Sequence, residues 1–360
     1  MMKKVLIICG IIFLIIILSI IGGLLWYNSA QKPVNTKEVK QCEIEIKSGM
    51  STEKILNLLH ENGLIKNVFA SEIYIKLNDV KGLQAGKYNL SSDMSLIEIL
   101  EQISSGKIVD ETISITFVEG KNMRWVAKTI AENTNNTEDQ VYELLQDKEY
   151  IKTLINKYWF LTDDILDANI YYPLEGYLWP DTYKFENKDV SVKEIFNTLL
   201  SKTEKVLEEN KTQIQNSKIG IHRIMTFASI VELEGRDKES KNEIASVIYN
   251  RLAKNMSIGS DVTTYYGIKV DMSERNLYKS EINTYNPYNT RGPNMEGKLP
   301  VGPIAMVSKD AINAVLNPTK TDYLYFVADS NGKIYFSKTY EEHQEIINNL
   351  RQQGLWYEYE

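Results

Sequence analysis

The chain has 360 residues, with 41 lysines and arginines against 48 aspartates and glutamates, a formal net charge of −7, three histidines and two cysteines. Its 43% hydrophobic and 25% charged residues are ordinary for a globular protein and exclude a disordered or collagen-like chain. At roughly 100 to 200 residues per domain, the length predicts two folded units rather than one. Two cysteines, Cys9 and Cys42, offer neither a disulfide framework nor a cysteine-rich metal site.

The 23 residues from Val5 to Tyr27 carry no charge and are dominated by Ile and Leu. As a helix they would reach roughly 34 Å, enough to cross a hydrocarbon core of about 30 Å. A cleaved signal peptide has a shorter apolar core of roughly 7 to 15 residues, and only Ser29 and Ala30 suggest a cleavage site. We therefore expect residues 5–27 to be an uncleaved transmembrane anchor.

The charges around this run predict its orientation. Lys3 and Lys4 precede it, which places residues 1–4 in the cytoplasm and the rest of the chain outside. Without these two lysines the exported part has a net charge of −9. Phosphate binding needs clustered cations, so nucleic acid is excluded as the main partner. The polar residues 28–42, with Pro33, predict a linker.

Residues 43–110 have the pattern of a small α+β domain. Ile44 and Ile46 alternate with polar residues as in a half-buried strand, and Ser51 is placed to cap the helix that follows. Further along, the patterns predict a helix over 67–77, a strand over 86–90 and a helix over 95–103 that begins with a Ser95/Glu98 capping box. This unit resembles the LysM-like modules found ahead of some cell-wall enzymes, although an unrelated α+β domain fits the pattern equally well.

A second copy of the opening pattern starts the larger unit, residues 111–360. Ile115 and Phe117 alternate with polar residues, Gly120 matches Gly49, and Asn122 stands where the cap Ser51 stood. A strand, a glycine turn and a capped helix form a common α+β unit, so the sequence leaves open whether the two copies reflect duplication.

The segment from Tyr171 to Tyr183 combines many aromatic residues with two prolines. Prolines disfavour a central strand or a long helix, so we expect an ordered loop or strand edge that exposes its rings. Tyrosine and tryptophan rings suit stacking on sugars, while buried, hydrogen-bonded tyrosines are the alternative explanation.

Residues 224–233 are apolar on nearly every side and predict a buried helix that stops at Gly235. Glu232 is the one carboxylate in this run. An apolar environment and the negative end of the helix dipole both disfavour its charged form, which suits a general acid. The alternatives are that Glu232 pairs with Arg236 at i+4 or points to solvent.

The remaining patterns predict a helix over 242–252, a loop-rich segment over 257–294, a hairpin over 323–336 and a helix over 340–350. The three histidines lie in no motif with a candidate nucleophile, and the sequence contains no G-x-S-x-G and no H-E-x-x-H. These counts argue against a hydrolytic triad and a zinc enzyme, and leave carboxylate chemistry.

Several blocks resemble the endolytic murein transglycosylase family (YceG-like, also called MltG) and follow its order along the chain. They are A-S-I-V-E-L-E at 228–234, A-S-V-I-Y-N-R-L at 245–252, S-D-V-T at 260–263 with Tyr266-Gly267, Y-N-T at 288–290, L-P-V-G-P-I at 299–304, L-E-G-Y at 174–177 with P-D-T-Y at 180–183, and Y-L-Y-F-V at 323–327. The resemblance implies an α+β fold with an N-terminal transmembrane helix, a small LysM-like domain and a larger catalytic domain, in the membrane of a bacterial cell.

In this family the Glu of S-I-V-E is the catalytic acid, which falls on Glu232. The implied reaction cleaves the β-1,4 bond between N-acetylmuramic acid and N-acetylglucosamine in nascent glycan strands, leaves a 1,6-anhydro end and so stops elongation. It needs neither metal nor cofactor. The implied partners are peptidoglycan and the penicillin-binding proteins that synthesise it. A non-catalytic peptidoglycan-binding scaffold for those synthases is the alternative.

The resemblance also implies a set of substrate-binding residues around this acid. Those that match its blocks, or stand beside the acid, are Glu234, Asp261, Tyr266, Tyr288, Asn289 and Thr290. The two tyrosines would stack on sugar rings, and Asn250 and Arg251 would brace the loops. Residues 291–298 depart from the family pattern, which leaves open the shape of the sugar-binding loop.

Overall fold

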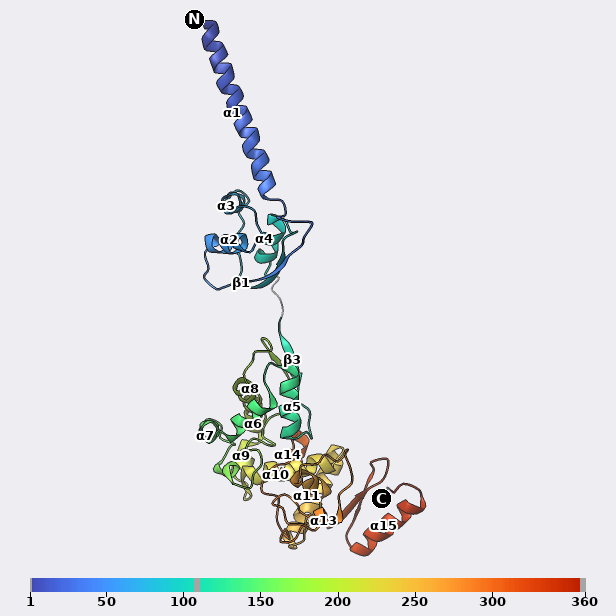
Figure 1. Cartoon of the computed structure of the whole chain (residues 1–360). Coiled ribbons are helices and arrows are strands. Elements are labelled where there is room, and N and C mark those ends of the chain that lie inside the picture. The colour runs from blue at the N-terminus through green and yellow to red at the C-terminus, as the bar shows by residue number, and fades with distance from the viewer. Residues whose placement is uncertain (1, 107–110, 357–360) are drawn as a thin grey trace. The chain divides into compact units, whose positions relative to one another are not determined.

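A computed structural model describes residues 2–106 and 111–356, with side chains from residue 8 onward. The chain divides into two compact units, Met1–Glu111 and Thr112–Glu360, each with its own core (Figure 1). The domain boundary predicted at residue 110 lies outside the described residues. Each unit mixes helices and short strands, so the fold is α+β.

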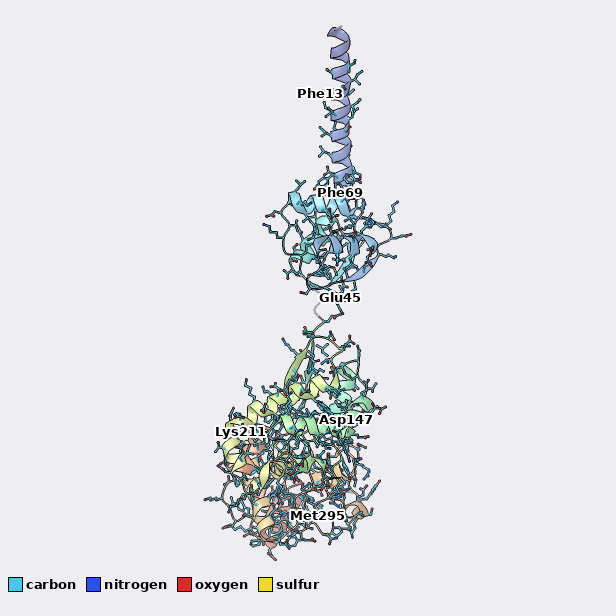
Figure 2. The ribbon with its side chains drawn as sticks, turned by 90° about the vertical axis from the view of Figure 1, so that its left-hand side faces the viewer. Phe13, Glu45, Phe69, Asp147, Lys211 and Met295 are labelled. Carbon is cyan, nitrogen blue, oxygen red and sulfur yellow. The ribbon has the colours of Figure 1, made fainter. Side chains whose placement is uncertain are left out.

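Helix α1, Met2–Ala30, contains the apolar run. Its Ile8–Ala30 part is long and apolar enough to cross a membrane, with a mean hydropathy of 3.0. Figure 2 shows Phe13 projecting from this helix, and its side chain is 65% exposed. A row of exposed large apolar side chains is unfavourable in water, so these side chains suit a lipid environment.

The first unit continues with β1 (Gln41–Ile46), α2 (Thr52–Glu61), α3 (Val68–Leu77), β2 (Gly86–Ser91) and α4 (Leu96–Ser104). These elements confirm the strands and helices predicted here. Ser51 and Asn67 cap α2 and α3, and Ser95 with Glu98 forms the predicted capping box at α4. The strands β1 and β2 pair antiparallel, and helix residues such as Leu56 and Ile99 pack against them.

The second unit opens with β3 (Ile113–Thr116), which pairs antiparallel with β4 (Thr182–Phe185). Between them lie α5 (Met123–Asn133), α6 (Glu138–Gln146), α7 (Lys148–Lys157) and a 3-10 turn at Asp163–Leu166; α8 (Val192–Leu207), a 3-10 turn at Glu208–Asn210 and α9 (Lys211–Gln215) follow. The predicted glycine turn and the Asn122 cap are confirmed, since Gly120 has φ +72° and the Asn122 side chain accepts from Trp125 N.

The aromatic segment Tyr171–Tyr183 does not expose its rings as predicted. Tyr177 is completely buried, and Trp179 and Tyr183 are each 8% exposed. The Tyr177 hydroxyl lies 2.8 Å from His222 Nδ1, and the Tyr183 hydroxyl donates to the Trp179 carbonyl. Because these hydroxyl groups find partners inside the protein, the rings can be buried at no hydrogen-bonding cost, and the alternative explanation is the correct one here.

The centre of the second unit is α10 (Gly220–Glu234), whose residues Ile224 to Val231 are all buried. It packs against α11 (Lys238–Ala253) and α14 (Lys309–Leu316). The chain also forms α12 (Asp261–Gly267), α13 (Lys279–Ile282), the hairpin β5 (Tyr325–Ala328) and β6 (Ile334–Ser337), and α15 (Tyr340–Gln352). The predicted buried helix, hairpin and final helix are confirmed, and α10 ends with two carboxylates, Glu232 and Glu234.

Candidate functional site

The C-terminal end of α10 places two glutamates close together in sequence. The helix stops at Gly235, as predicted, with the Gly235 amide donating to the Val231 carbonyl at 2.8 Å. Glycine is needed for space rather than for a left-handed turn, because a Cβ atom here would lie 2.5 Å from Lys241 Cγ. Glu232 and Glu234 are two positions apart and so project from different faces of α10.

Glu232 is held by an ion pair. Both of its carboxylate oxygens lie 2.9 Å from Lys241 Nζ, and Ser308 donates to it from its amide at 3.0 Å and from its hydroxyl. The Glu232 and Lys241 side chains are only 8% and 9% exposed. The alternative partner expected from sequence, Arg236, instead donates to the Asn331 carbonyl, so that pairing is wrong.

Glu234 faces a different environment. Its Oε1 accepts from the Ser260 hydroxyl at 2.5 Å. Burial raises the pKa of Glu234, and the nearby Asp261 adds to this effect, while the Ser260 hydrogen bond, Arg291 and Arg251 oppose it. A carboxyl whose pKa is raised stays protonated to higher pH, which is the state a general acid requires.

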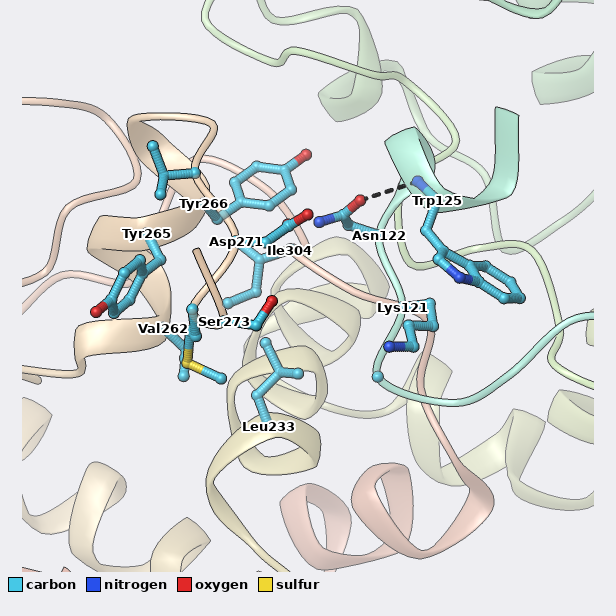
Figure 3. A pocket seen from close by; sticks show the side chains of 13 residues that line it. Lys121, Asn122, Trp125, Leu233, Val262, Tyr265, Tyr266, Asp271, Ser273 and Ile304 are labelled. Atoms are coloured by element: carbon cyan, nitrogen blue, oxygen red, sulfur yellow. Dashed lines mark hydrogen bonds between the residues drawn. The ribbon is translucent and has the colours of Figure 1, made fainter. Parts of the chain in front are cut away.

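A groove made of two adjoining cavities passes the end of α10. The larger cavity, about 940 Å³, is lined by Glu234, Arg251, Asp261 and Arg291 and, on its other side, by the β5–β6 hairpin and α15. The smaller cavity, about 290 Å³, lies between Gly120–Trp125 and α12 with the loop that follows it (Figure 3). Leu233, Val262 and Met272 line both cavities. Glu234 lines this groove, whereas Glu232 lines neither cavity.

The predicted substrate-binding residues separate into two groups. Asp261, ion-paired with Arg291, lines the larger cavity, and Tyr266 lines the smaller one. Tyr288, Asn289 and Thr290 are at most 1% exposed. This differs from the prediction that they contact sugar, because none of the three lines either cavity.

The buried group fixes the position of α12 instead. Asn289 Nδ2 donates to the carbonyls of residues 281, 282 and 284, and its Oδ1 accepts from Thr264. The Thr290 hydroxyl accepts from the Ser260 amide and bonds the Thr263 hydroxyl. This network holds Ser260 in place, and Ser260 in turn donates a hydrogen bond to Glu234.

The comparisons with known proteins agree with one another. The YceG-like family pattern matches residues 44–349. An endolytic murein transglycosylase of Bacillus subtilis is 37% identical over 328 residues, which cover 90% of this chain and 89% of that protein. The chain belongs to the YceG-like family. The resemblance noted in its sequence blocks is thereby confirmed.

Two further relatives support this membership. An endolytic murein transglycosylase of Streptococcus pneumoniae is 28% identical and covers 96% of this chain and 65% of its own length. The crystal structure of a yceG-like protein from Listeria monocytogenes shares 32% identity with a TM-score of 0.61, and the match covers 86% of this chain and all of that one. The YceG-like fold therefore extends over most of the chain.

The sequence did not predict the residues that hold the two glutamates. Lys241 and Ser308 hold Glu232, and Ser260 holds Glu234, yet only Ser260 stands in one of the family blocks. Asn250 and Arg251, expected to brace loops, do so: Asn250 donates to two backbone carbonyls before β5, and Arg251 donates to the Leu324 carbonyl. That prediction is confirmed.

Glu175 is a further carboxyl that periodicity did not single out. It is 2% exposed, and its Oε2 accepts from the Met123 amide at 2.9 Å and from the Tyr266 hydroxyl at 3.0 Å. Its Oε1 has no hydrogen-bond partner among the described residues. Burial raises the pKa of Glu175 to about 7, although these two donors and Arg124 lower it.

The raised pKa of Glu175 makes stability fall as pH rises. Between the ordinary carboxyl pKa of 4.5 and about 7, the unfolded chain releases the Glu175 proton while the folded chain keeps it, so the free energy of unfolding decreases by up to about 3 kcal/mol. Glu175→Gln should remove this dependence. Denaturant unfolding at pH 5 and pH 8 measures it, with Glu149→Gln on the exposed face of α7 as a control. An unchanged pH slope in Glu175→Gln would contradict the expectation.

Proposed function

We propose that this chain is a lytic transglycosylase that cleaves the β-1,4 bond between N-acetylmuramic acid and N-acetylglucosamine in peptidoglycan. Its relatives in B. subtilis and S. pneumoniae are endolytic murein transglycosylases. The observation that carries the proposal is a carboxyl with a raised pKa, Glu234, lining a groove of about 940 Å³ that continues into a second cavity. A groove that extends past the acid suits a polymer cut within its length.

Glu234 is the carboxyl whose surroundings best suit the acid. One face of it opens to the groove, and its pKa is raised by burial. Glu232, the residue assigned from the sequence, has Lys241 and Ser308 on its carboxylate and lines neither cavity. A proton donor must reach the atom that it protonates. We therefore assign the acid to Glu234, and Glu232 stays as the competing assignment.

The reaction needs one carboxyl in two states. Protonated Glu234 gives its proton to the glycosidic oxygen as the bond from C1 of the muramic acid breaks, which releases the hydroxyl end of N-acetylglucosamine. The muramic acid C6 hydroxyl then bonds to C1 and passes its proton to the Glu234 carboxylate. The product is a 1,6-anhydro ring, no water is consumed, and the acid is restored. The use of a single carboxyl distinguishes this route from hydrolysis, which uses a pair of carboxyl groups.

The activity itself is tested with the full chain in detergent micelles. Incubation with purified peptidoglycan sacculi should cut the strands internally and so create new 1,6-anhydromuramic acid ends. These ends are counted by mass spectrometry after muramidase digestion. Hydrolytic reducing ends in their place, or no new ends at all, would overturn the proposal.

Removal of the Ser260 hydroxyl should shift the pH range of this activity. The Ser260 hydrogen bond lowers the pKa of Glu234, so Ser260→Ala raises that pKa further. The protonated acid then persists to higher pH, and the alkaline limb of the kcat/KM profile moves upward. A profile measured from pH 5 to pH 9 on soluble glycan strands checks this shift. Ser257→Ala serves as the control, because Ser257 also lines the larger cavity but its side chain makes no hydrogen bond to Glu234. A shift of the alkaline limb to lower pH in Ser260→Ala would contradict the assignment.

The anchor and the first unit complete the proposal. Helix α1 would hold the chain in the bacterial membrane, with residues 1–4 in the cytoplasm and the chain that follows the helix outside, where new glycan strands are made. The first unit, with its own core beside a two-stranded sheet, would act as a LysM-like glycan-binding domain. In that position its proposed partners would be the penicillin-binding proteins.

A further inference from the structure

The smaller cavity has walls from two distant parts of the chain. One wall is Gly120–Trp125, which leads into α5, and the other runs from Val262 in α12 to Ser273. Leu233 and Ile304 lie between the two walls (Figure 3). The spacing of this cavity therefore depends on contacts that join α5 to α12.

Glu175 makes such a contact from behind the cavity. A single oxygen, Oε2, accepts from the amide of Met123 at the first turn of α5 and from the hydroxyl of Tyr266 in α12. The neighbour of Met123, Asn122, and Tyr266 itself both line the cavity, whereas Glu175 does not. Both walls are thus fixed to the same atom.

The Glu175 carboxyl is buried at a cost in free energy. Glu175 is 2% exposed and its second oxygen has no partner among the described residues, and burying such a group costs free energy. The two donors that it accepts from, however, would otherwise be buried without an acceptor. The buried Glu175 carboxyl therefore satisfies both donors and sets the distance between α5 and α12.

The lining of the cavity has the chemistry of a sugar site. Trp125 supplies a partly exposed aromatic ring beside the more buried Tyr265 and Tyr266, and Asn122 and Ser273 supply uncharged hydrogen-bonding groups. Tyrosine and tryptophan combine an apolar face with a polar group, which matches the apolar faces and hydroxyl groups of a pyranose. The cavity meets the larger one at Leu233, next to Glu234.

We propose that the smaller cavity binds an N-acetylated sugar of the glycan strand on one side of Glu234, and that Glu175 is the positioning residue that keeps its two walls at binding distance. The proposal rests on the proposed function for its ligand, a glycan. Glu175 itself touches no substrate, so its loss should weaken binding and leave the proton transfer at Glu234 intact.

Binding is measured in the full chain in detergent, with Glu234→Gln present to slow cleavage by about 10²- to 10⁴-fold. The probe is a fluorescently labelled, uncrosslinked glycan strand released from peptidoglycan, followed by anisotropy. Glu175→Leu removes both acceptors and should weaken binding at least about tenfold, since 1.4 kcal/mol corresponds to tenfold. Glu175→Gln keeps an acceptor oxygen and should bind within about threefold of the parent. Lys152→Ala, on the exposed face of α7, is the unchanged control.

The same substitutions with Glu234 intact give a second readout. Glu175→Leu should raise KM about tenfold with kcat within about twofold, and Glu175→Gln should restore KM. If Glu175→Leu does not fold, Tyr266→Phe decides, because it keeps the ring and removes one of the two bonds to Glu175. Parental binding by folded Glu175→Leu, or by Tyr266→Phe, overturns the proposal. If the strand binds as expected but the intact chain forms no 1,6-anhydro ends, the proposed function fails while the binding role of Glu175 stands.

Discussion

Glu234→Gln should lower the rate of 1,6-anhydro end formation by about 10²- to 10⁴-fold, the usual contribution of a positioned general acid. Glutamine keeps the shape of the side chain and an oxygen that can accept from the Ser260 hydroxyl, but it has no acidic proton to give to the leaving oxygen. The loss should appear in kcat, while binding of glycan strands stays close to that of the parent. The full chain in detergent, sacculi and mass spectrometry of the released ends provide the measurement.

Comparison with Glu232→Gln tests which of the two glutamates is the acid. Glu232 is bound by Lys241 and Ser308 and does not line the groove, so we expect its substitution to affect stability first. Activity is therefore compared at a temperature where both variants are shown to be folded. Full activity of Glu234→Gln beside an inactive, folded Glu232→Gln would return the acid to Glu232.

Local patterns predicted the elements of both units with few errors. The apolar run of α10, the capping box at Ser95 and the hairpin of β5 and β6 all follow from short-range spacing, which side chains obey because caps and periodicity act within one or two turns. The aromatic segment at Tyr177 and Trp179 failed because the partners of its rings, such as His222, lie far away in the sequence. Exposure depends on such partners, and spacing does not reveal them.

The choice between Glu232 and Glu234 as the acid also depends on contacts with residues far away in the sequence. Spacing shows that Glu232 and Glu234 lie on different faces of the helix, but not which face meets a cation. Lys241 reaches Glu232 from α11, and Ser308 precedes α14. Ser260 reaches Glu234 from the turn before α12. These tertiary contacts decide which carboxyl is held in an ion pair and which is left in the groove.

Breaking the ion pair between Glu232 and Lys241 should strongly destabilise the second unit. Removing one partner of a buried pair leaves the other charge buried without compensation, at a cost of about 3 to 5 kcal/mol. Glu232→Gln and Lys241→Met should each lower the free energy of unfolding by about this amount, because both side chains are less than 10% exposed. Denaturant unfolding followed by tryptophan fluorescence measures the change.

The double variant tests whether the two effects have one origin. With Glu232→Gln and Lys241→Met combined, no uncompensated charge remains, so the loss should be smaller than the sum of the single losses by about 1 to 3 kcal/mol. The exposed pair of Lys128 and Glu132 on α5, with side chains 64% and 62% exposed, offers a matched control whose cycle should give less than about 1 kcal/mol. Additive losses at Glu232 and Lys241 would mean that the pair does not stabilise the fold through its charges. The end of α10 would then depend on packing around Lys241, where Gly235 leaves room for its side chain.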